Sequence, residues 1–296
     1  MPVKKTKTTT VLLIVFRLIP RFIRKALFIS VFCLFYLLDV RTRLIAWHNL
    51  QRAFPEKTIE EITKLSRAVY RHFAIVAAEF FDIPYLTKDN VHQWGDVEGL
   101  EHYHEAIAKG KGVLSIVAHF GNWELLPMGI PIYAKPIYIV YRPLDNRIVD
   151  NMVEYVRTLR GNVLIPKGGS GKRIMELLKR NEIIGILSDQ NVSVQEGVFV
   201  EFFGRPACTS VGLAVMAMRS GAPVLAIFPA RQKSGRYKVI LKPPMEAVVT
   251  GDDEKDLVVN TQRFTKVIED IIREYPEQWF WFHQRWKTKP WQKERT

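Results

Sequence analysis

Four residues separate His119 from Glu124 in this chain, a spacing that suits acid–base chemistry. A glutamate in the first turn of a helix is kept ionised by the helix dipole. A hydrogen bond from an imidazole nitrogen to that carboxylate would fix the tautomer and raise the basicity of the other ring nitrogen. Such a pair is the base and orienter of a catalytic triad, with a substrate hydroxyl as the nucleophile. The competing interpretation is that the two residues only cap a strand and a helix.

The elements that would position this pair are a strand and a short helix. The apolar, β-branched run at residues 113–117 predicts a buried strand ending at His119. Gly121 and Asn122 break the strand, and we expect Asn122 to cap a helix that begins near Trp123. Two prolines, Pro127 and Pro131, should keep that helix short or kinked.

Polar residues follow two further predicted strands. Arg142 comes directly after the strand Tyr138–Tyr141, and Asp189 follows the strand Ile183–Leu187. Ligands of open α/β sheets bind where strands end at one edge, so we expect both residues near His119. A guanidinium there could hold a phosphate or a developing oxyanion through forked N–H donors. The alternatives are an arginine on the surface and an aspartate that caps a turn.

The composition of the chain indicates which classes of binding partner to expect. Its 296 residues are 48% hydrophobic, enough for a large core, and the net charge of +13 favours a polyanionic partner. Mean hydropathy near zero excludes a polytopic membrane protein. No zinc-finger, helix-turn-helix or RRM signature is present, so we do not expect nucleic acid as a partner. The two cysteines are far apart in sequence and fit a reducing cytoplasm. We expect no metal and no cofactor.

The segment from Val11 to Val40 is mainly apolar, and we expect it to attach the protein to a membrane. Its uninterrupted apolar core, Ala26–Leu38, has 13 residues, whereas a spanning helix needs about 20. Four basic residues and a proline suggest a hydrophobic hairpin or an interfacial helix whose cations meet lipid headgroups: Arg17, Pro20, Arg21, Arg24 and Lys25. A tilted single span is the alternative.

Other periodic stretches complete the predicted domain. Apolar spacing and a capping box predict a long helix over Thr58–Ala78, and further helices are predicted over Arg147–Arg160 and Asp256–Glu274. A strand near Val224 should pair with Tyr237–Lys242. We therefore expect an α/β fold, a mixed open sheet flanked by helices over residues 43–296, after a membrane-anchoring segment at 1–42.

Several sequence motifs resemble those of one enzyme family. The sequence His-Phe-Gly-Asn-Trp-Glu at 119–124 resembles the H-x4-D/E box of glycerolipid-type acyltransferases, and its wording is similar to the late lauroyl/myristoyl acyltransferases of lipid A. Three more boxes resemble that family in the same order, at 141–143, 188–190 and 221–229, and the aromatic-basic tail at 276–287 resembles its C-terminal signature.

The resemblance implies an acyltransferase-like fold and an O-acyltransferase on the cytoplasmic face of the inner membrane. The donor would be an acyl carrier protein thioester or acyl-CoA, and the acceptor a hydroxyl of a phosphorylated glycolipid, the lipid A precursor. An anionic membrane is the third partner. His119 and Glu124 would be catalytic. Arg142, Gly121 and Asn122 would bind substrate near the oxyanion, and Asp189 would position the acceptor.

Three other functions stay open from sequence. A 1-acylglycerol-phosphate acyltransferase, which makes phosphatidic acid, also uses an H-x4-D/E motif. The exact sequence of the motif and the C-terminal tail favour the lipid A acyltransferases over that enzyme. A basic, non-catalytic membrane scaffold would not need His119 and Glu124. A hydrolase could use the same base to activate water.

Overall fold

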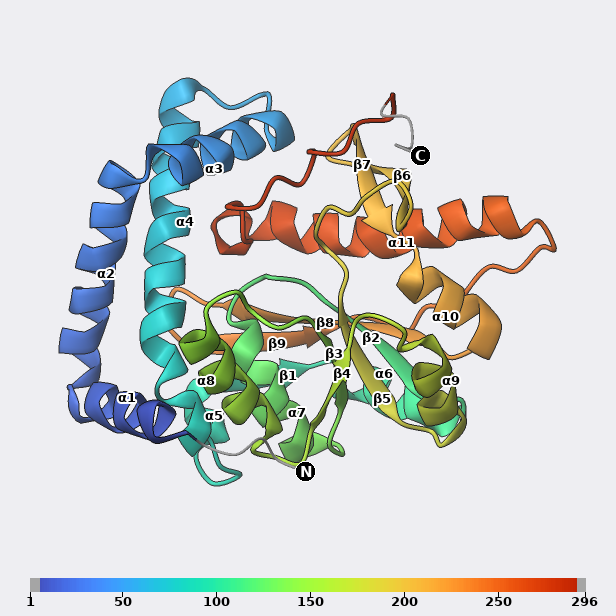
Figure 1. The fold of residues 1–296 in the computed structure, drawn as a ribbon, viewed down its shortest axis with the longest axis horizontal. Helices are drawn as coiled ribbons and strands as arrows, with labels where there is room; N and C mark the ends of the chain where they lie inside the picture. Colours follow the sequence, from blue (N-terminus) through green and yellow to red (C-terminus); the bar gives the residue numbers. More distant parts are fainter. Residues whose placement is uncertain (1–5, 292–296) are drawn as a thin grey trace.

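A seven-stranded mixed sheet forms the centre of the molecule (Figure 1) in the computed structural model, which describes residues 6–291. The strand order is β1-β9-β8-β2-β5-β3-β4, and a separate hairpin pairs β6 with β7. All neighbours in the large sheet are parallel except β8 and β9. The strands are β1 (Gly95–Glu98), β2 (Val113–Val117), β3 (Tyr138–Tyr141), β4 (Val163–Pro166), β5 (Ile183–Leu187), β6 (Gly197–Phe202), β7 (Arg205–Ser210), β8 (Val224–Arg231) and β9 (Tyr237–Leu241). The predicted α/β fold with a mixed sheet is confirmed.

Helices cover both faces of the sheet because its central strands are apolar on both sides. Along β2, Leu114 and Ile116 pack with helices α3, α4, α9, α10 and α11, whereas Val113 packs on the opposite face with α6 and α7. The helices are α1 (Lys7–Leu18), α2 (Arg21–Leu38), α3 (Val40–Ala53), α4 (Ile59–Phe80), α5 (Val91–Trp94), α6 (Leu100–Ala108), α7 (Leu126–Tyr133), α8 (Arg147–Thr158), α9 (Gly171–Lys179), α10 (Gly212–Ser220) and α11 (Asp253–Glu274), with 3-10 turns η1 (Ile83–Tyr85), η2 (Trp123–Leu125) and η3 (Pro276–Gln278).

The long helix α4 begins with the predicted capping box. The Thr58 side chain accepts from the Glu61 N–H at 3.2 Å, and the Glu61 carboxylate accepts from the Thr58 N–H at 2.8 Å. Helix α2 runs alongside α4 at one side of the molecule (Figure 1). The short helix α1 joins the end of α4 in a second core cluster, where Phe16 stacks on Phe81 with ring centroids 4.5 Å apart. Helix α3 runs through residue 42, where we predicted the anchor to end.

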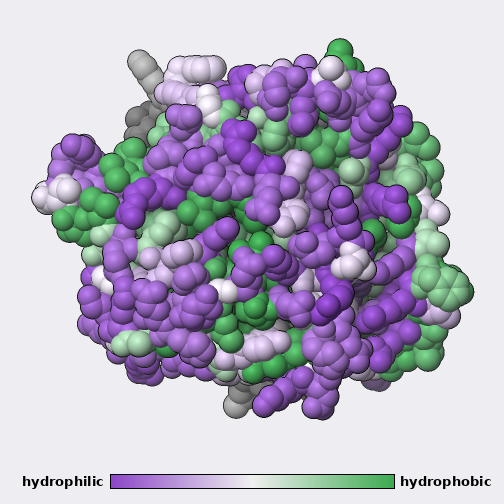
Figure 2. All heavy atoms as spheres, turned by 180° about the vertical axis from the view of Figure 1, so that it is seen from behind, coloured by the Kyte–Doolittle hydropathy of each residue, from purple (hydrophilic) through white to green (hydrophobic). Residues whose placement is uncertain are grey.

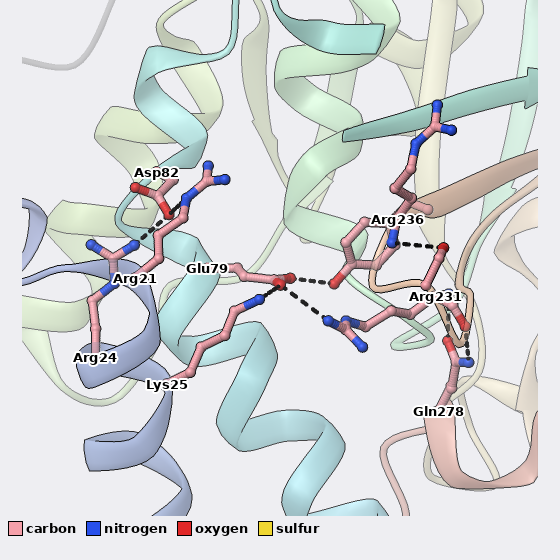
Figure 3. Close-up of polar contacts among 10 residues, drawn as sticks. Arg21, Arg24, Lys25, Glu79, Asp82, Arg231, Arg236 and Gln278 are labelled. Atoms are coloured by element: carbon pink, nitrogen blue, oxygen red, sulfur yellow. Dashed lines mark hydrogen bonds and ion pairs between the residues drawn. The ribbon is translucent and has the colours of Figure 1, made fainter. Parts of the chain in front are cut away.

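The basic residues of α1 and α2 correct one prediction. Arg24 is 1% exposed and donates to Asp82, and Arg21 donates to the same carboxylate at 2.9 Å. Lys25 lies 2.8 Å from Glu79 (Figure 3). Arg24 therefore contacts Asp82 and not lipid headgroups, because two buried carboxylates need compensating charge. The Arg21 side chain stays 61% exposed.

The outer surface of the same two helices is apolar. Twelve large hydrophobic side chains on α1 and α2 are exposed: Val11, Ile14, Val15, Leu18, Phe22, Ile23, Leu27, Val31, Leu34, Phe35, Leu37 and Leu38. In the reverse view, apolar side chains gather along the edge of the molecule on this side (Figure 2). Within residues 6–291, none of the helices has both the length and the apolar character needed to cross a membrane.

Candidate active site

Two neighbouring parallel strands bring a histidine and an aspartate together. Strand β2 ends at Val117 and β5 ends at Leu187, and these two residues are partners in the sheet register. His119 and Asp189 each follow two residues later, so they leave the same edge side by side. This edge is where open α/β sheets bind their ligands.

The His119 imidazole is hydrogen-bonded to Asp189. Nδ1 lies 2.8 Å from Oδ1, and the backbone N–H of His119 donates to Oδ2 at 2.9 Å. Trp279 donates to the same Oδ2 from its indole nitrogen at 2.8 Å. With Nδ1–H donated to a carboxylate, Nε2 is the proton acceptor, and it has no hydrogen-bond partner among residues 6–291. The His119 side chain is 21% exposed, so a substrate can reach it.

Asp189 stays ionised although it is buried. Burial opposes its charge, but the imidazole of His119 and the N–H groups that donate to the carboxylate outweigh that effect and hold its pKa well below the usual range. A buried, ionised carboxylate next to Nδ1 stabilises the imidazolium that forms when Nε2 takes up a proton. The arrangement is therefore chemically suited to general-base catalysis.

Glu124 does not orient His119, which corrects our prediction. Its carboxylate accepts from Arg157 Nε at 2.9 Å and Nη2 at 2.5 Å, and from the Trp123 indole at 2.9 Å. In the described structure no hydrogen bond joins Glu124 to His119. The 3-10 turn η2 directs Glu124 toward α8, where the bidentate pairing with a guanidinium is stronger than a single bond to imidazole.

Trp123 lies between the His119–Asp189 pair and the Arg157–Glu124 pair. Its ring centroid lies 5.3 Å from that of His119, and its N–H donates to Glu124. Burial works against the charge of Arg157, but Glu124 outweighs that effect and raises the pKa of the guanidinium. A buried Arg157–Glu124 ion pair therefore lies behind Trp123.

Gly121 holds the turn after the strand. Its φ is +58°, and a Cβ here would lie 1.8 Å from the carbonyl oxygen of Pro229, so only glycine fits. Its N–H donates to the Gln278 carbonyl at 2.8 Å, and its carbonyl lies 3.3 Å from Nε2 of His72. The N–H that we expected to bind an oxyanion is thus already engaged within the protein.

Asn122 and Arg142 also differ from expectation. Asn122 makes no side-chain cap to η2 and is completely buried, beside the Tyr237 hydroxyl. The Arg142 side chain is 77% exposed and lies 3.5 Å from Asp145. Strand β3, which carries Arg142, is separated from β2 by β5, and Arg142 makes no contact with His119 in the described part of the chain.

An ionic network connects the N-terminal helices to this site (Figure 3). Glu79 accepts from the Tyr237 hydroxyl at 2.6 Å and lies 2.8 Å from Lys25 and 3.5 Å from Arg231. The Gln278 side chain bonds both backbone groups of Arg231, at 2.7 Å each. Since the Gln278 carbonyl also accepts from Gly121, α2 and the turn after His119 belong to one bonded framework.

Sequence reasoning missed two residues of the site. Arg157 follows Val153 and Val156 on the apolar stripe of α8, and a charge within such a stripe was a usable signal. Trp279 lies 90 residues from the carboxylate that it contacts, and no local pattern indicates that contact. His283 is buried near the site, where burial lowers its pKa to about 4 and Nδ1 lies 3.1 Å from the Phe280 carbonyl.

An apolar cavity lies next to Trp123, whose ring contacts His119. It encloses about 440 Å³, including its opening to solvent, and Trp123, Arg157 and the ends of β2 and β5 line it. A larger cavity of about 780 Å³ lies beyond it, between the sheet and helices α5, α6 and α7.

Comparison with known proteins assigns a family. The family model for bacterial lipid A biosynthesis acyltransferase matches residues 6–288. The chain is 30% identical over 258 residues to the lipid A biosynthesis palmitoleoyltransferase of Escherichia coli K12, covering 84% of this chain and 80% of that protein. It is 29% identical over 255 residues to the lauroyltransferase of the same organism, covering 84% and 80%.

Two more distant matches are also acyltransferases. A phosphatidylinositol mannoside acyltransferase of Mycolicibacterium smegmatis is 24% identical over 244 residues, covering 80% of this chain and 77% of that protein. The crystal structure of the 1-acyl-sn-glycerophosphate acyltransferase of Thermotoga maritima is 16% identical, with a TM-score of 0.41 over 88% of this chain and all of that one.

Proposed function

The chain belongs to the bacterial lipid A biosynthesis acyltransferase family, and from that membership we propose that it moves a fatty acyl chain from an acyl carrier protein thioester to a hydroxyl of a lipid A precursor. That it transfers an acyl group to a lipid acceptor follows from the family. The donor, the acceptor hydroxyl and the catalytic roles below are parts of the proposal. The observation that carries the mechanism is the bond between His119 Nδ1 and the buried Asp189.

In this mechanism His119 acts as the general base. Nε2 takes the proton of the acceptor hydroxyl while its oxygen attacks the thioester carbonyl carbon. Asp189 keeps the imidazole in the required tautomer and stabilises the imidazolium. The C–S bond then breaks, an ester remains, and the imidazolium returns the proton to the departing thiolate. Arg157 lies at the wall of the near cavity, and in this mechanism a guanidinium N–H that Glu124 does not use donates to the oxyanion.

The two apolar cavities support an acyl donor. The near cavity begins at Trp123, whose ring contacts His119, so a chain lying there would present its thioester at the catalytic pair. The net charge of +13 suits both an acidic carrier protein and a phosphorylated glycolipid.

The exposed apolar side of α1 and α2 supports attachment to the cytoplasmic face of the inner membrane. Contiguous exposed apolar surface of this kind marks an interaction site. Four basic residues of these helices pair with Asp82 or Glu79, namely Arg17, Arg21, Arg24 and Lys25, so the proposed attachment depends mainly on apolar burial.

The test is an assay of the purified protein with two donors and two acceptors. Acyl carrier protein thioester and acyl-CoA are each offered with a lipid A precursor and with 1-acylglycerol 3-phosphate, and the products are identified by mass spectrometry. We expect an added acyl ester on the lipid A precursor with the carrier-protein thioester. Phosphatidic acid as the main product, or free fatty acid alone, would overturn the proposal.

A further inference from the structure

Three arginines gather at the C-terminal end of helix α2, where its apolar outer face stops. The guanidinium carbon of Arg43 lies 5.3 Å from the centre of the Tyr36 ring, and that of Arg67 lies 5.9 Å from the same centre. Arg71 is exposed on α4 four positions after Arg67, and residues at this spacing share one face of a helix. The arginines of α3 and α4 thus surround a tyrosine of α2.

This positive charge has little compensation within the protein. The side chains of Arg43, Arg67 and Arg71 form no ion pair among residues 6–291, unlike the cations at the other end of α2, which pair with carboxylates of α4. Asp39 lies between α2 and α3, but its carboxylate caps α3 by accepting from the Thr42 N–H at 3.0 Å. Like charges held close together repel one another, and an anion among them relieves that repulsion. Guanidinium groups match the geometry of a phosphate in particular.

A continuous series of ring contacts leads from this cluster to His119. The ring centroids of Tyr36 and Tyr70 are 5.1 Å apart, and those of Tyr70 and Phe282 are 4.7 Å apart. Phe282 lies 5.0 Å from Phe280, whose ring is 6.1 Å from the His119 imidazole. Phe280 and Phe282 are only half-buried. The Tyr70 hydroxyl is buried and has no hydrogen-bond partner in the described part of the chain, so a donor is left unused beside this series.

We propose that Arg43, Arg67 and Arg71 bind a phosphate group of the acceptor glycolipid, and that its body lies along the aromatic series with the reacting hydroxyl at His119. This inference rests on the proposed function, in which the acceptor is a phosphorylated glycolipid. Aromatic side chains suit such a ligand because they offer large contact area in fixed positions.

The place of the cluster fits an acceptor that comes from a bilayer. Leu37 and Leu38 follow Tyr36 directly and are 64% and 70% exposed, so they belong to the apolar surface of α2. The arginines therefore lie at the edge of the surface by which we propose that the protein attaches to the membrane. A lipid entering from that side meets the arginines before it reaches His119.

Two of the three arginines are suitable for substitution. The side chains of Arg67 and Arg71 are exposed and make no hydrogen bond or ion pair within residues 6–291. Arg43 is unsuitable because it also donates to two backbone carbonyls at the end of α2, at 2.6 and 3.3 Å. Arg219 is a matched control: it is exposed and unpaired in the same range, and its helix α10 lies on the opposite side of the molecule from α4 (Figure 1).

The experiment compares wild type, Arg67→Gln, Arg71→Gln, the double variant and Arg219→Gln with two acceptors, the lipid A precursor and the same precursor without its phosphates. We expect each single change to lower kcat/KM for the phosphorylated acceptor about 10-fold, because one hydrogen bond to a charged group is lost. The double variant should use both acceptors almost equally, and Arg67→Lys should recover part of the loss. Arg219→Gln should keep the wild-type preference. An unchanged preference in the double variant, or an equal loss with both acceptors, would overturn the proposal.

Binding without turnover separates this inference from the proposed function. Titration calorimetry in detergent, with the two glycolipids and no acyl donor, should show tighter binding of the phosphorylated form by the wild type and no such difference in the double variant. That result would stand even if no acyl transfer were seen, which would overturn only the proposed function.

Vesicles test the other source of phosphate, the headgroups of bilayer lipids. The double variant should sediment with phosphatidylethanolamine–phosphatidylglycerol vesicles as the wild type does. Loss of vesicle binding with an unchanged preference between the two glycolipids would show that the arginines bind membrane lipids, and would overturn the acceptor site.

Discussion

The indole nitrogen of Trp279 lies 2.8 Å from Oδ2 of Asp189, the carboxylate that also binds the His119 imidazole. Trp279 is fully buried, and its N–H is one of two donors to that oxygen, together with the backbone N–H of His119. The C-terminal segment therefore fixes the orientation of the carboxylate that, in the proposed mechanism, supports His119.

Trp279→Phe should lower kcat about 10-fold while the protein stays folded. Loss of the N–H removes one hydrogen bond to a charged group, which destabilises by about 1.5–3 kcal/mol, and frees Asp189 to rotate. Trp281→Phe is the matched control: Trp281 is equally buried, but its N–H donates to the Pro276 carbonyl. Thermal unfolding and kcat of both variants are the measurements. Equal kcat values in the two variants would show that Trp279 has only a packing role.

His119 and Asp189 should behave as one unit. His119→Ala and Asp189→Asn should each lower kcat by at least about 10²-fold, because the amide cannot stabilise the imidazolium. The double variant should be little worse than the worse single variant, since catalytic partners are not additive. The same cycle with Glu124→Gln and His119→Ala is the comparison, and we expect those two effects to be closer to additive. Additivity for His119 with Asp189 would argue against the pair.

Gly121 should tolerate no side chain. A residue other than glycine at positive φ costs about 1–2 kcal/mol, and at Gly121 the Cβ would also overlap the Pro229 carbonyl. Gly204→Ala isolates the first cost, because Gly204 has φ +68° and no atom within 4 Å of its Cβ. We expect Gly204→Ala to fold with a small loss of stability and Gly121→Ala to lose far more, measured by urea unfolding. Similar losses in both would contradict the close approach.

Stability should fall as the pH drops from 6.5 toward 4. Burial lowers the pKa of both His72 and His283 to about 4, from 6.5 in the unfolded chain. In that window the unfolded state binds protons that the native state does not, so the free energy of unfolding decreases by up to about 1.4 kcal/mol per pH unit for each histidine. Asp189, whose native pKa is depressed, contributes a loss only below pH 4.

Urea unfolding at several pH values measures this slope, and His72→Gln should reduce it by about one proton. A stability that does not change between pH 6.5 and 4.5 would contradict the burial of both imidazoles in neutral form.

Binding to vesicles should depend on the outer face of α1 and α2 and only weakly on salt. Leu18 and Phe22 are 77% and 74% exposed, so replacing both with glutamate should release the protein from phosphatidylethanolamine–phosphatidylglycerol vesicles without lowering its melting temperature. Ile59→Glu is the control, at 70% exposure on α4. Sedimentation at about 0.1 and 1 M salt tests the mechanism. Full release by salt alone would show that charge, not apolar burial, holds the protein there.

Local patterns predicted the central strands well and the hairpin not at all. Strands β3 and β5 have the predicted bounds, because parallel strands inside a sheet are short continuous apolar runs. The β6–β7 hairpin carries Pro206 within a strand and turns at Phe203 and Gly204, both with positive φ. Asn-Gly is the usual signal for such a turn, and a proline argues against a strand.

The site was predicted in its parts but not in its pairing. His119 and Asp189 were both expected at the sheet edge, since each follows a recognisable strand. Which carboxylate meets the imidazole depends on the register of β2 with β5 and on Arg157, which binds Glu124 from another helix. Neither is encoded near residue 119, so sequence spacing favoured the wrong acid.

The bond from Trp279 to Asp189 also sets when the enzyme can become active. His119, Asp189 and Trp279 come from three parts of the chain, and the last contact spans 90 residues. Non-local contacts form late because the intervening chain must first be ordered. During synthesis, a nascent chain that has reached Asp189 already holds both the base and its carboxylate, yet the carboxylate is fixed only once Trp279 has been made. Formation of the His119–Asp189–Trp279 arrangement is thus coupled to completion of the fold.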